Sequence, residues 1–259
     1  MKHIYLDYAA TTPVDKAVAA ACAHCHGIKF FNPASTHACG RGAAKDVEDA
    51  RRKCAEAIGA VPREIIFTSG GTESVNQAML KTELPHGKKQ IIVSGLEHDS
   101  VSACAQKLAE GGYDVRYLMP DGNGMITPEA LRSVITENTG LVCVMTVNNI
   151  VGTVQPVKEL CEIAHGCGAL FFTDAVQAVN SVDLNVKSSG VDLLAASGHK
   201  FYAPKGVGFL YVRSGIKTSP LIIGGEQEFG LRAGTVNVPA AVAMGEAVRL
   251  AAERREEYL

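Results

Sequence analysis

The stretch LVCVMTVNNIVGTVQPVKELCEIAHGCGALFFT, residues 141–173, contains two apolar runs separated by a helical pattern. The runs LVCVMTV (141–147) and LFFT (170–173) are rich in β-branched and aromatic residues, as buried strands are. Between them, VKELCEIAHGCG (157–168) repeats apolar residues every three or four positions and closes with glycine, which indicates a helix. A strand, a helix and a second strand in this order are typical of a parallel βαβ unit.

The same alternation extends along most of the chain, which has 259 residues, 47% of them apolar, enough for one substantial core. Helical patterns lie between most of the apolar runs, so we expect an α/β fold with a mainly parallel seven-stranded sheet flanked by helices. Residues 198–206 are too few for a parallel crossover, which predicts that the last strand runs antiparallel. The other predicted strands are IIFT (65–68), QIIVS (90–94), VRYL (115–118), DLLAAS (192–197) and VGFLYV (207–212).

Two further helical patterns lie outside this alternation. KDVEDARRKCAEAIG (45–59) is amphipathic, and PAAVAMGEAVRLAAERREEYL (239–259) is long and becomes strongly charged towards its end. We therefore expect three parts: an N-terminal segment (1–15), a large domain that binds the ligand (16–240) and a terminal helix (241–259).

The charge balance and the absence of long apolar runs restrict the kinds of partner that we expect the protein to bind. Lysine plus arginine number 25 and aspartate plus glutamate 27, and a net charge of −2 gives no reason to expect nucleic acid. No run approaches the roughly 20 apolar residues of a membrane span, and the start MKHIYLDYAATTP lacks the apolar stretch of a signal peptide. We expect a cytoplasmic protein with no membrane contact and a small-molecule ligand.

The eight cysteines are predicted to be free thiols, because disulfides are uncommon without export. Cys54 and Cys143 fall at apolar positions and are expected to pack inside the protein. CAHCH (22–26) has the spacing of a c-type haem attachment site and could alternatively bind a metal. No second ligand pair is evident, so no metal site is predicted.

Chemistry-bearing side chains follow five of the predicted strands. In open parallel sheets, ligands bind beyond the carboxyl ends of the strands, where loops and helix N-termini meet. Each residue alone has an ordinary interpretation, such as a helix cap for Asp174 or a solvated charge for Lys200. Together they predict a ligand site at one edge of the sheet. The residues are Gly70, Gly71 and Thr72; His98; Asn148 and Asn149; Asp174 and Gln177; and Gly198, His199 and Lys200.

Pyridoxal phosphate accounts for the whole set. This cofactor needs a lysine to hold its aldehyde as a Schiff base, an acid to keep its pyridine nitrogen protonated, and an anion site for its phosphate. Lys200, Asp174 and SGGT (69–72) supply these in turn, and His98 is the candidate to cover the ring. The sequence lacks G-x-G-x-x-G, a Walker lysine motif and H-E-x-x-H, which removes the common nucleotide and zinc-protease interpretations.

A family resemblance adds to this interpretation. The motifs YLDYAATTPV, NPASTH, FTSGGTES, EHDSV, VNN, TDAVQ, SGHKFYAPKGVG and GLRAGTVNV occur in this order over nearly the whole chain. With them the sequence resembles the NifS/IscS-type cysteine desulfurases of the class-V aminotransferase group. The resemblance implies the large domain of the fold-type I pyridoxal phosphate enzymes, in a homodimer. It also implies that L-cysteine, or a related amino acid, is converted to alanine and a persulfide for iron–sulfur cluster assembly, with a possible sulfur-acceptor scaffold protein as partner.

The resemblance also implies a role for each site residue. Lys200 forms the Schiff base and acts as a general base, and His98 stacks on the ring and moves protons. Asp174 pairs with the pyridine nitrogen, and Gln177 and Asn149 contact the ring oxygen. The implied phosphate contacts are Gly71, Thr72, Ser197 and His199, together with Thr235, which would reach the phosphate of the neighbouring subunit.

The sequence departs from the family pattern in several places. The family usually continues into a small C-terminal domain that carries a nucleophilic cysteine and an arginine for the substrate carboxylate. We expect that domain to be absent here, so that activity is impaired or needs a partner. Ile150 and Glu226 stand where the family commonly has glutamate and glycine. Cys39, on the expected loop NPASTHACGRG (32–42), is a candidate replacement nucleophile.

Two other functions stay open at this point. A selenocysteine lyase or another class-V activity would use the same residues of the large domain. A noncatalytic, cofactor-binding scaffold, or a truncated remnant, would keep the cofactor site without turnover.

Overall fold

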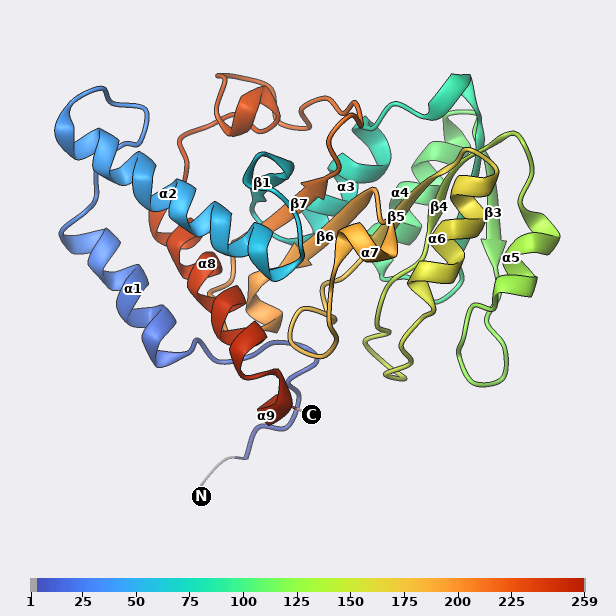
Figure 1. The fold of residues 1–259 in the computed structure, drawn as a ribbon, viewed down its shortest axis with the longest axis horizontal. Helices are drawn as coiled ribbons and strands as arrows, with labels where there is room; N and C mark the ends of the chain where they lie inside the picture. The colour runs from blue at the N-terminus through green and yellow to red at the C-terminus, as the bar shows by residue number, and fades with distance from the viewer. Residues whose placement is uncertain (1–3, 259) are drawn as a thin grey trace.

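The computed structural model describes residues 4–258, which form a central sheet covered by helices on both faces (Figure 1). The sheet of these residues has seven strands in the order β1-β7-β6-β5-β4-β2-β3. Strand β7 is antiparallel to both of its neighbours, and the other pairs are parallel. The predicted mainly parallel sheet and its antiparallel last strand are therefore confirmed. The strands are β1 (Ile65–Thr68), β2 (Gln90–Ser94), β3 (Asp114–Leu118), β4 (Thr139–Cys143), β5 (Leu170–Asp174), β6 (Leu193–Ser197) and β7 (Gly208–Val212).

Helices occupy most of the connections between the strands. None of those in residues 4–258 combines the length and the apolar character that crossing a bilayer requires. The α-helices are α1 (Lys16–Gly27), α2 (Ala38–Ala57), α3 (Gly71–Lys81), α4 (Asp99–Glu110), α5 (Pro128–Val134), α6 (Val157–Gly166), α7 (Val186–Ser189), α8 (Val238–Glu253) and α9 (Arg255–Tyr258). Single 3-10 turns lie at Pro62–Glu64, Pro85–Gly87, Gly198–Lys200 and Glu228–Gly230.

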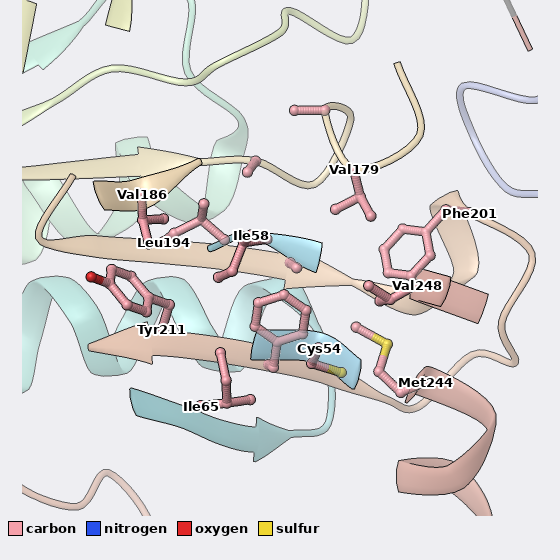
Figure 2. Packing of buried hydrophobic residues seen from close by; sticks show 14 of the residues in the cluster. Cys54, Ile58, Ile65, Val179, Val186, Leu194, Phe201, Tyr211, Met244 and Val248 are labelled. Atoms are coloured by element: carbon pink, nitrogen blue, oxygen red, sulfur yellow. The ribbon is translucent and has the colours of Figure 1, made fainter. Parts of the chain in front are cut away.

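Two apolar layers hold the helices against the sheet. Successive side chains of a strand point to opposite faces, so Ile65 packs in one layer and Ile66 in the other. Helices α3 and α4 cover the face of Ile66, whereas α2, α8 and α6 pack on the face of Ile65. Figure 2 shows part of the layer on the face of Ile65, which includes Tyr211 of β7 and Ile58, the residue that follows α2. Both faces are covered, which explains why the strands read as continuous apolar runs.

Helix α2 begins earlier than the amphipathic pattern indicated. It starts at Ala38, so the predicted loop over residues 32–42 is wrong in its second half, and Cys39 lies exposed in the first helical turn. His37 caps this turn, because its Nδ1 accepts the Gly40 N–H at 3.2 Å. A Cβ on Gly40 would collide with the Ser35 carbonyl oxygen. The glycine here permits close packing at a helix start.

Other boundaries also differ from the patterns. Strand β4 ends at Cys143, and α5 ends at Val134, where Ile135 turns to extended backbone. The terminal pattern is interrupted at Arg254, which separates α8 from α9. Helix α8 runs through the expected boundary at residues 240 and 241 and packs against α1 and α2. The division of the chain into three parts stays a prediction, and residues 1–3 and 259 of it lie outside the described residues.

Candidate functional site

A pocket of about 360 Å³ lies beyond the carboxyl ends of β2, β4, β5 and β6. Most residues of this pocket lie at or just after the ends of separate strands, as the strand-end pattern predicted. Every residue with an implied role at the site lies in its lining except Thr235. Gly70, Asn148 and Gly198, which were also named from the strand ends, are not in the lining. The lining residues are Asp7, Ala9, Ala10, Gly71, Thr72, His98, Ser100, Met145, Asn149, Asp174, Val176, Gln177, Ser197, His199 and Lys200.

The N-terminus of α3 forms one wall. Gly70 has φ 154° and ψ −176°, a conformation that only glycine adopts readily, and Gly71 begins the helix. A Cβ on Gly71 would lie 2.9 Å from Cγ2 of Val176, so the backbone must stay bare for the chain to pass this closely. The first N–H groups of a helix have no partner within the helix, and with the helix dipole they favour a bound anion.

Asp174, the last residue of β5, is 5% exposed. Its Oδ1 accepts the Val176 N–H at 2.9 Å, and no other hydrogen bond reaches the carboxylate from the described part of the chain. Burial raises the pKa of Asp174, against the opposing effects of the Val176 N–H and the positive charges of His98 and Lys200. The second carboxylate oxygen is therefore available to a donor in the pocket.

Lys200 closes the 3-10 turn that follows β6. Its Nζ donates to the carbonyl oxygens of Ala9 at 2.6 Å and Ala10 at 2.9 Å. Burial lowers the pKa of Lys200, against the attraction of Asp174 and Asp7. A larger fraction of neutral amine is what a nucleophilic or basic lysine needs.

The N-terminal segment is part of the pocket, which the sequence patterns did not predict. Gln177 Nε2 donates to the Ala9 carbonyl oxygen at 2.8 Å, the same atom that Lys200 contacts. Thr12 donates to the His199 carbonyl oxygen from both its backbone N–H and its Oγ1, each at 2.9 Å. Ala9 and Thr12 of the N-terminal segment lie in neither a strand nor a helix, so the motif YLDYAATTPV was the only sequence feature that pointed to them.

His98 caps α4 and also lines the pocket. Its Nδ1 accepts the Ser100 N–H at 3.1 Å, and Ser100 Oγ lies 2.9 Å from the same nitrogen. Because a backbone N–H donates to Nδ1, the neutral ring carries its proton on Nε2. The ordinary helix-cap role and the predicted site role therefore apply to the same side chain.

His199 also lines the pocket, and its Nδ1 lies 3.1 Å from Thr11 Oγ1. Burial lowers the pKa of His199, with smaller contributions from the charges of Lys200 and Lys205. A neutral His199 can donate one hydrogen bond without adding charge to the pocket. Lys205 itself is exposed.

The two asparagines after β4 divide their roles. Asn148 is buried, and its Oδ1 accepts the backbone N–H groups of Ile150 and Val151, both at 2.9 Å. Its Nδ2 donates to the Leu96 carbonyl oxygen at 3.0 Å. Asn149 lines the pocket on the turn that Asn148 holds in place.

Several residues singled out in the sequence lie elsewhere. Thr235 lines a second hollow beside Arg51 and Phe229. Cys39 is not in the lining of the main pocket. Cys25 of the CAHCH stretch is buried in α1. Cys54 and Cys143, which were expected inside, are fully buried.

Comparison with known proteins places these features in a family. The class-V aminotransferase family model matches residues 4–257. The chain is 45% identical to the putative cysteine desulfurase IscS 1 of Bacillus subtilis, over 99% of this chain and 68% of the relative. A solved NifS-like protein superposes with a TM-score of 0.95 at 37% identity, covering 99% of this chain and 71% of that one. SspA, solved in complex with cysteine, superposes with a TM-score of 0.91 at 39% identity, covering 95% and 72%.

The match covers almost all of this chain but not all of its relatives. The chain spans between 63% and 68% of the length of the curated relatives that it matches. The chain belongs to the class-V aminotransferase family, with IscS- and NifS-type cysteine desulfurases as its relatives.

Proposed function

We propose that the pocket binds pyridoxal phosphate and that the chain acts on L-cysteine as a cysteine desulfurase-type enzyme. The products would be alanine and a persulfide for transfer to a sulfur-acceptor protein. The observation that carries the proposal is the convergence of Lys200, Asp174 and the α3 N-terminus on one pocket. The family match and the cysteine bound to SspA support the choice of cofactor and substrate.

The described residues fit this cofactor. The bare backbone at Gly71 leaves room for a phosphate at the start of α3, since any side chain there would meet Val176. Asp174 has a carboxylate oxygen that accepts no hydrogen bond from the described chain. Lys200 is partly buried and has a lowered pKa, which suits an amine that attacks an aldehyde.

When bound, pyridoxal phosphate supplies an electron-withdrawing ring that stabilises negative charge at the α-carbon of the substrate. Asp174 would hold a proton at the ring nitrogen, because its carboxylate is buried and otherwise short of donors. Lys200 would bind the aldehyde carbon and, once released from it, remove the α-proton. His98 can donate or accept a proton at Nε2, because Nδ1 is occupied by the Ser100 N–H.

Desulfuration also needs a thiolate that accepts the substrate sulfur. No cysteine of the described residues lies in the lining of the pocket. The proposal therefore assigns cofactor binding and proton transfer to the pocket residues, and sulfur acceptance to a thiol from outside the lining. We include a homodimer in the proposal, with Thr235 reaching the phosphate of the second subunit.

Covalent attachment of the cofactor tests the proposal. The wild-type protein should be yellow with pyridoxal phosphate and should retain pyridoxal after borohydride reduction, whereas Lys200→Ala should lose the adduct. Lys205→Ala is the matched control, because Lys205 lies five residues away and is exposed. Mass spectrometry of the reduced protein measures the adduct. Equal labelling of Lys200→Ala and wild type would refute the assignment of Lys200.

Substrate choice needs a separate measurement. Cofactor-loaded protein is mixed with L-cysteine, L-selenocysteine or L-alanine, with dithiothreitol as the external thiol, while absorbance and released sulfide or selenide are followed. A change in the cofactor band and sulfide release with cysteine are expected. A band that does not respond to any of the three amino acids would favour a noncatalytic scaffold.

A further inference from the structure

Glu97 has a carboxyl group beside the pocket that the proposed reaction does not use. Glu97 precedes His98 in the turn between β2 and α4, and its side chain is only partly exposed. Its Oε1 accepts the Met145 N–H at 2.6 Å. Its Oε2 is inaccessible to solvent and has no hydrogen-bond partner. The carboxyl end is thus enclosed although part of the residue reaches the surface.

This environment does not suit an anion. A buried carboxylate with one backbone donor and no cation partner carries a large desolvation cost. The charged or titratable neighbours that influence it are Asp174 at the end of β5 and Cys143 at the end of β4, and neither is a cation at any pH. Burial, with repulsion from Asp174, raises the pKa of Glu97 well above the ordinary value, and the Met145 N–H opposes this only in part.

The hydrogen bonds around Glu97 connect it to the pocket. The Met145 N–H bond and the bond from Asn148 Nδ2 to the Leu96 carbonyl oxygen hold the turn that carries His98 against the segment that follows β4. Met145 and His98 both line the pocket. A change at Glu97 should therefore shift both Met145 and His98, although Glu97 itself does not line the pocket.

We propose that Glu97 carries a proton on its enclosed Oε2 and, in this neutral form, fixes the His98 turn against the segment that follows β4, while Asp174 stays the anionic carboxylate of the pocket. Glu97 is thus a positioning residue. Its effect on the cofactor rests on the proposed function, whereas its protonation state can be measured on the cofactor-free protein.

Urea unfolding of the cofactor-free protein against pH tests the protonation state. If Glu97 keeps its proton in the folded state, the wild type loses stability as pH rises above about 4.5, because only the unfolded state then releases it. Glu97→Gln cannot release a proton. Relative to wild type, its unfolding constant should therefore fall roughly tenfold per pH unit until Glu97 itself ionises in the fold.

Glu64 provides a matched control, because it does not line the pocket. It is also buried, but its two oxygens accept the Val61 N–H at 3.0 Å and the Ser214 N–H at 2.8 Å. Burial opposes ionisation of Glu64, yet these hydrogen bonds outweigh it and lower its pKa. Glu64→Gln should therefore lose stability relative to wild type as pH rises towards about 4.5 and show no further change above it, whereas Glu97→Gln gains relative stability above that pH. If Glu97→Gln instead followed the pattern of Glu64→Gln, Glu97 would be anionic and the proposal would be overturned.

Infrared spectroscopy gives a second readout. The wild type minus Glu97→Gln difference spectrum at neutral pH should contain the carbonyl stretch of a protonated carboxylic acid and no carboxylate band. A carboxylate band would overturn the proposal independently of stability and of cofactor binding.

The positioning role is tested by Glu97→Leu, which leaves the buried Met145 N–H without an acceptor. This variant should bind pyridoxal phosphate roughly tenfold more weakly, because the orphaned donor disturbs the pocket wall. Glu97→Gln keeps an acceptor, and its cofactor absorbance band and the pH dependence of that band should match wild type. Unchanged affinity in Glu97→Leu, or a shifted band in Glu97→Gln, would contradict the positioning role.

Discussion

Asp174 shows how a residue that is suited to binding a ligand can lower the stability of the ligand-free fold. Its carboxylate is buried with one hydrogen bond from the described chain, and burial raises its pKa. In the cofactor-free protein this charge destabilises the fold above the ordinary pKa of 3.8, since the unfolded chain ionises there more easily. Sites built in this way are stabilised when their ligand supplies the missing partner.

Asp174→Asn should therefore stabilise the cofactor-free protein and weaken cofactor binding. Asparagine can still accept the Val176 N–H but carries no buried charge. Each kcal/mol of relieved cost corresponds to a rise of about 2–4 °C in the melting temperature at neutral pH. The gain should vanish below pH 3.8, where both states of the wild type are protonated. Calorimetry of the cofactor-free protein measures the first effect, and cofactor titration measures the second.

Asp192→Asn is the control for this experiment. Asp192 is fully buried too, but it accepts the Phe171 N–H at 2.7 Å and is paired with His165 and Arg213. Asp192→Asn should lower the melting temperature, because it removes a carboxylate charge that is paired with His165 and Arg213. Asp174→Asn, in contrast, removes a buried charge that has no such partner. If Asp174→Asn also lowered the melting temperature of the cofactor-free protein, the assigned cost of Asp174 would be wrong.

Sequence patterns could predict the residues of the site that directly follow strands. Asp174 and Lys200 come at the ends of apolar runs that form strands. Predicting each strand and where it ends was therefore sufficient to place these two residues at the edge of the sheet. Ala9 was not predictable in this way, because it contacts Lys200 across 191 positions and belongs to no periodic element. Glu97 was missed because its enclosure depends on Met145, which lies 48 positions away and follows a separate strand.

At the scale of elements, a buried ion pair holds the segment before α8 against α2. Arg51 of α2 donates to both carboxylate oxygens of Glu228, each at 2.7 Å, and to the Ile65 carbonyl oxygen at 2.6 Å. Its guanidinium carbon lies 5.0 Å from the ring centre of Phe67 and 4.9 Å from that of Phe229. The segment that leads to Thr235 is thus fixed through one arginine.

Arg51→Met should cost about 3–5 kcal/mol of unfolding free energy, because it leaves the Glu228 carboxylate buried without its cation and with the uncharged Phe67 N–H still donating to it. Arg51→Met with Glu228→Gln should recover part of this loss, since the unpaired charge is then removed. Arg52→Ala is the neighbouring control: Arg52 is exposed, its partners Asp49 and Glu56 lie at the surface, and its loss should cost far less than the loss of Arg51. Urea unfolding at neutral pH measures all three, and equal effects of Arg51 and Arg52 would contradict the assignment.

The periodicity of the sequence predicted most helices and strands correctly, but it did not predict all of the residues at which they begin and end. Helix α2 was predicted from residue 45 because its first turns contain Gly40 and Gly42, which favour loops when considered alone. The structure retains Gly40 in the helix because the Ser35 carbonyl lies against it. A tertiary contact therefore overrides the local preference. By contrast, β7 was assigned its direction correctly, because a short connection excludes a crossover whatever surrounds it.

At the scale of the whole molecule, the pocket and Thr235 lie in different hollows of one chain. The segment before Thr235 exposes large apolar side chains: Ile222 is 40% exposed, Ile223 85% and Phe229 55%. Clusters of exposed apolar residues are typical of protein interfaces. They support the proposed homodimer, in which Thr235 would serve the pocket of the second subunit.

The dimer and the role of Thr235 make one joint prediction. Ile223→Lys should shift the protein from dimer to monomer in sedimentation velocity, since a charge would be desolvated at the contact. It should also weaken pyridoxal phosphate binding, because Thr235 then no longer reaches the other pocket. Thr235→Ala should weaken cofactor binding to a similar degree while the protein stays dimeric, which separates the contact from the interface.

Tyr117→Lys controls for the mere addition of a lysine, because Tyr117 is 50% exposed on β3, at the opposite edge of the sheet from β1. It should change neither the sedimentation coefficient nor cofactor affinity. Mass action gives a further check: if a partner residue completes each pocket, the cofactor affinity of the wild type should fall on dilution below the dimer dissociation constant. A wild-type monomer that binds the cofactor equally well at every protein concentration would show that each chain completes its own pocket, with Thr235 outside it.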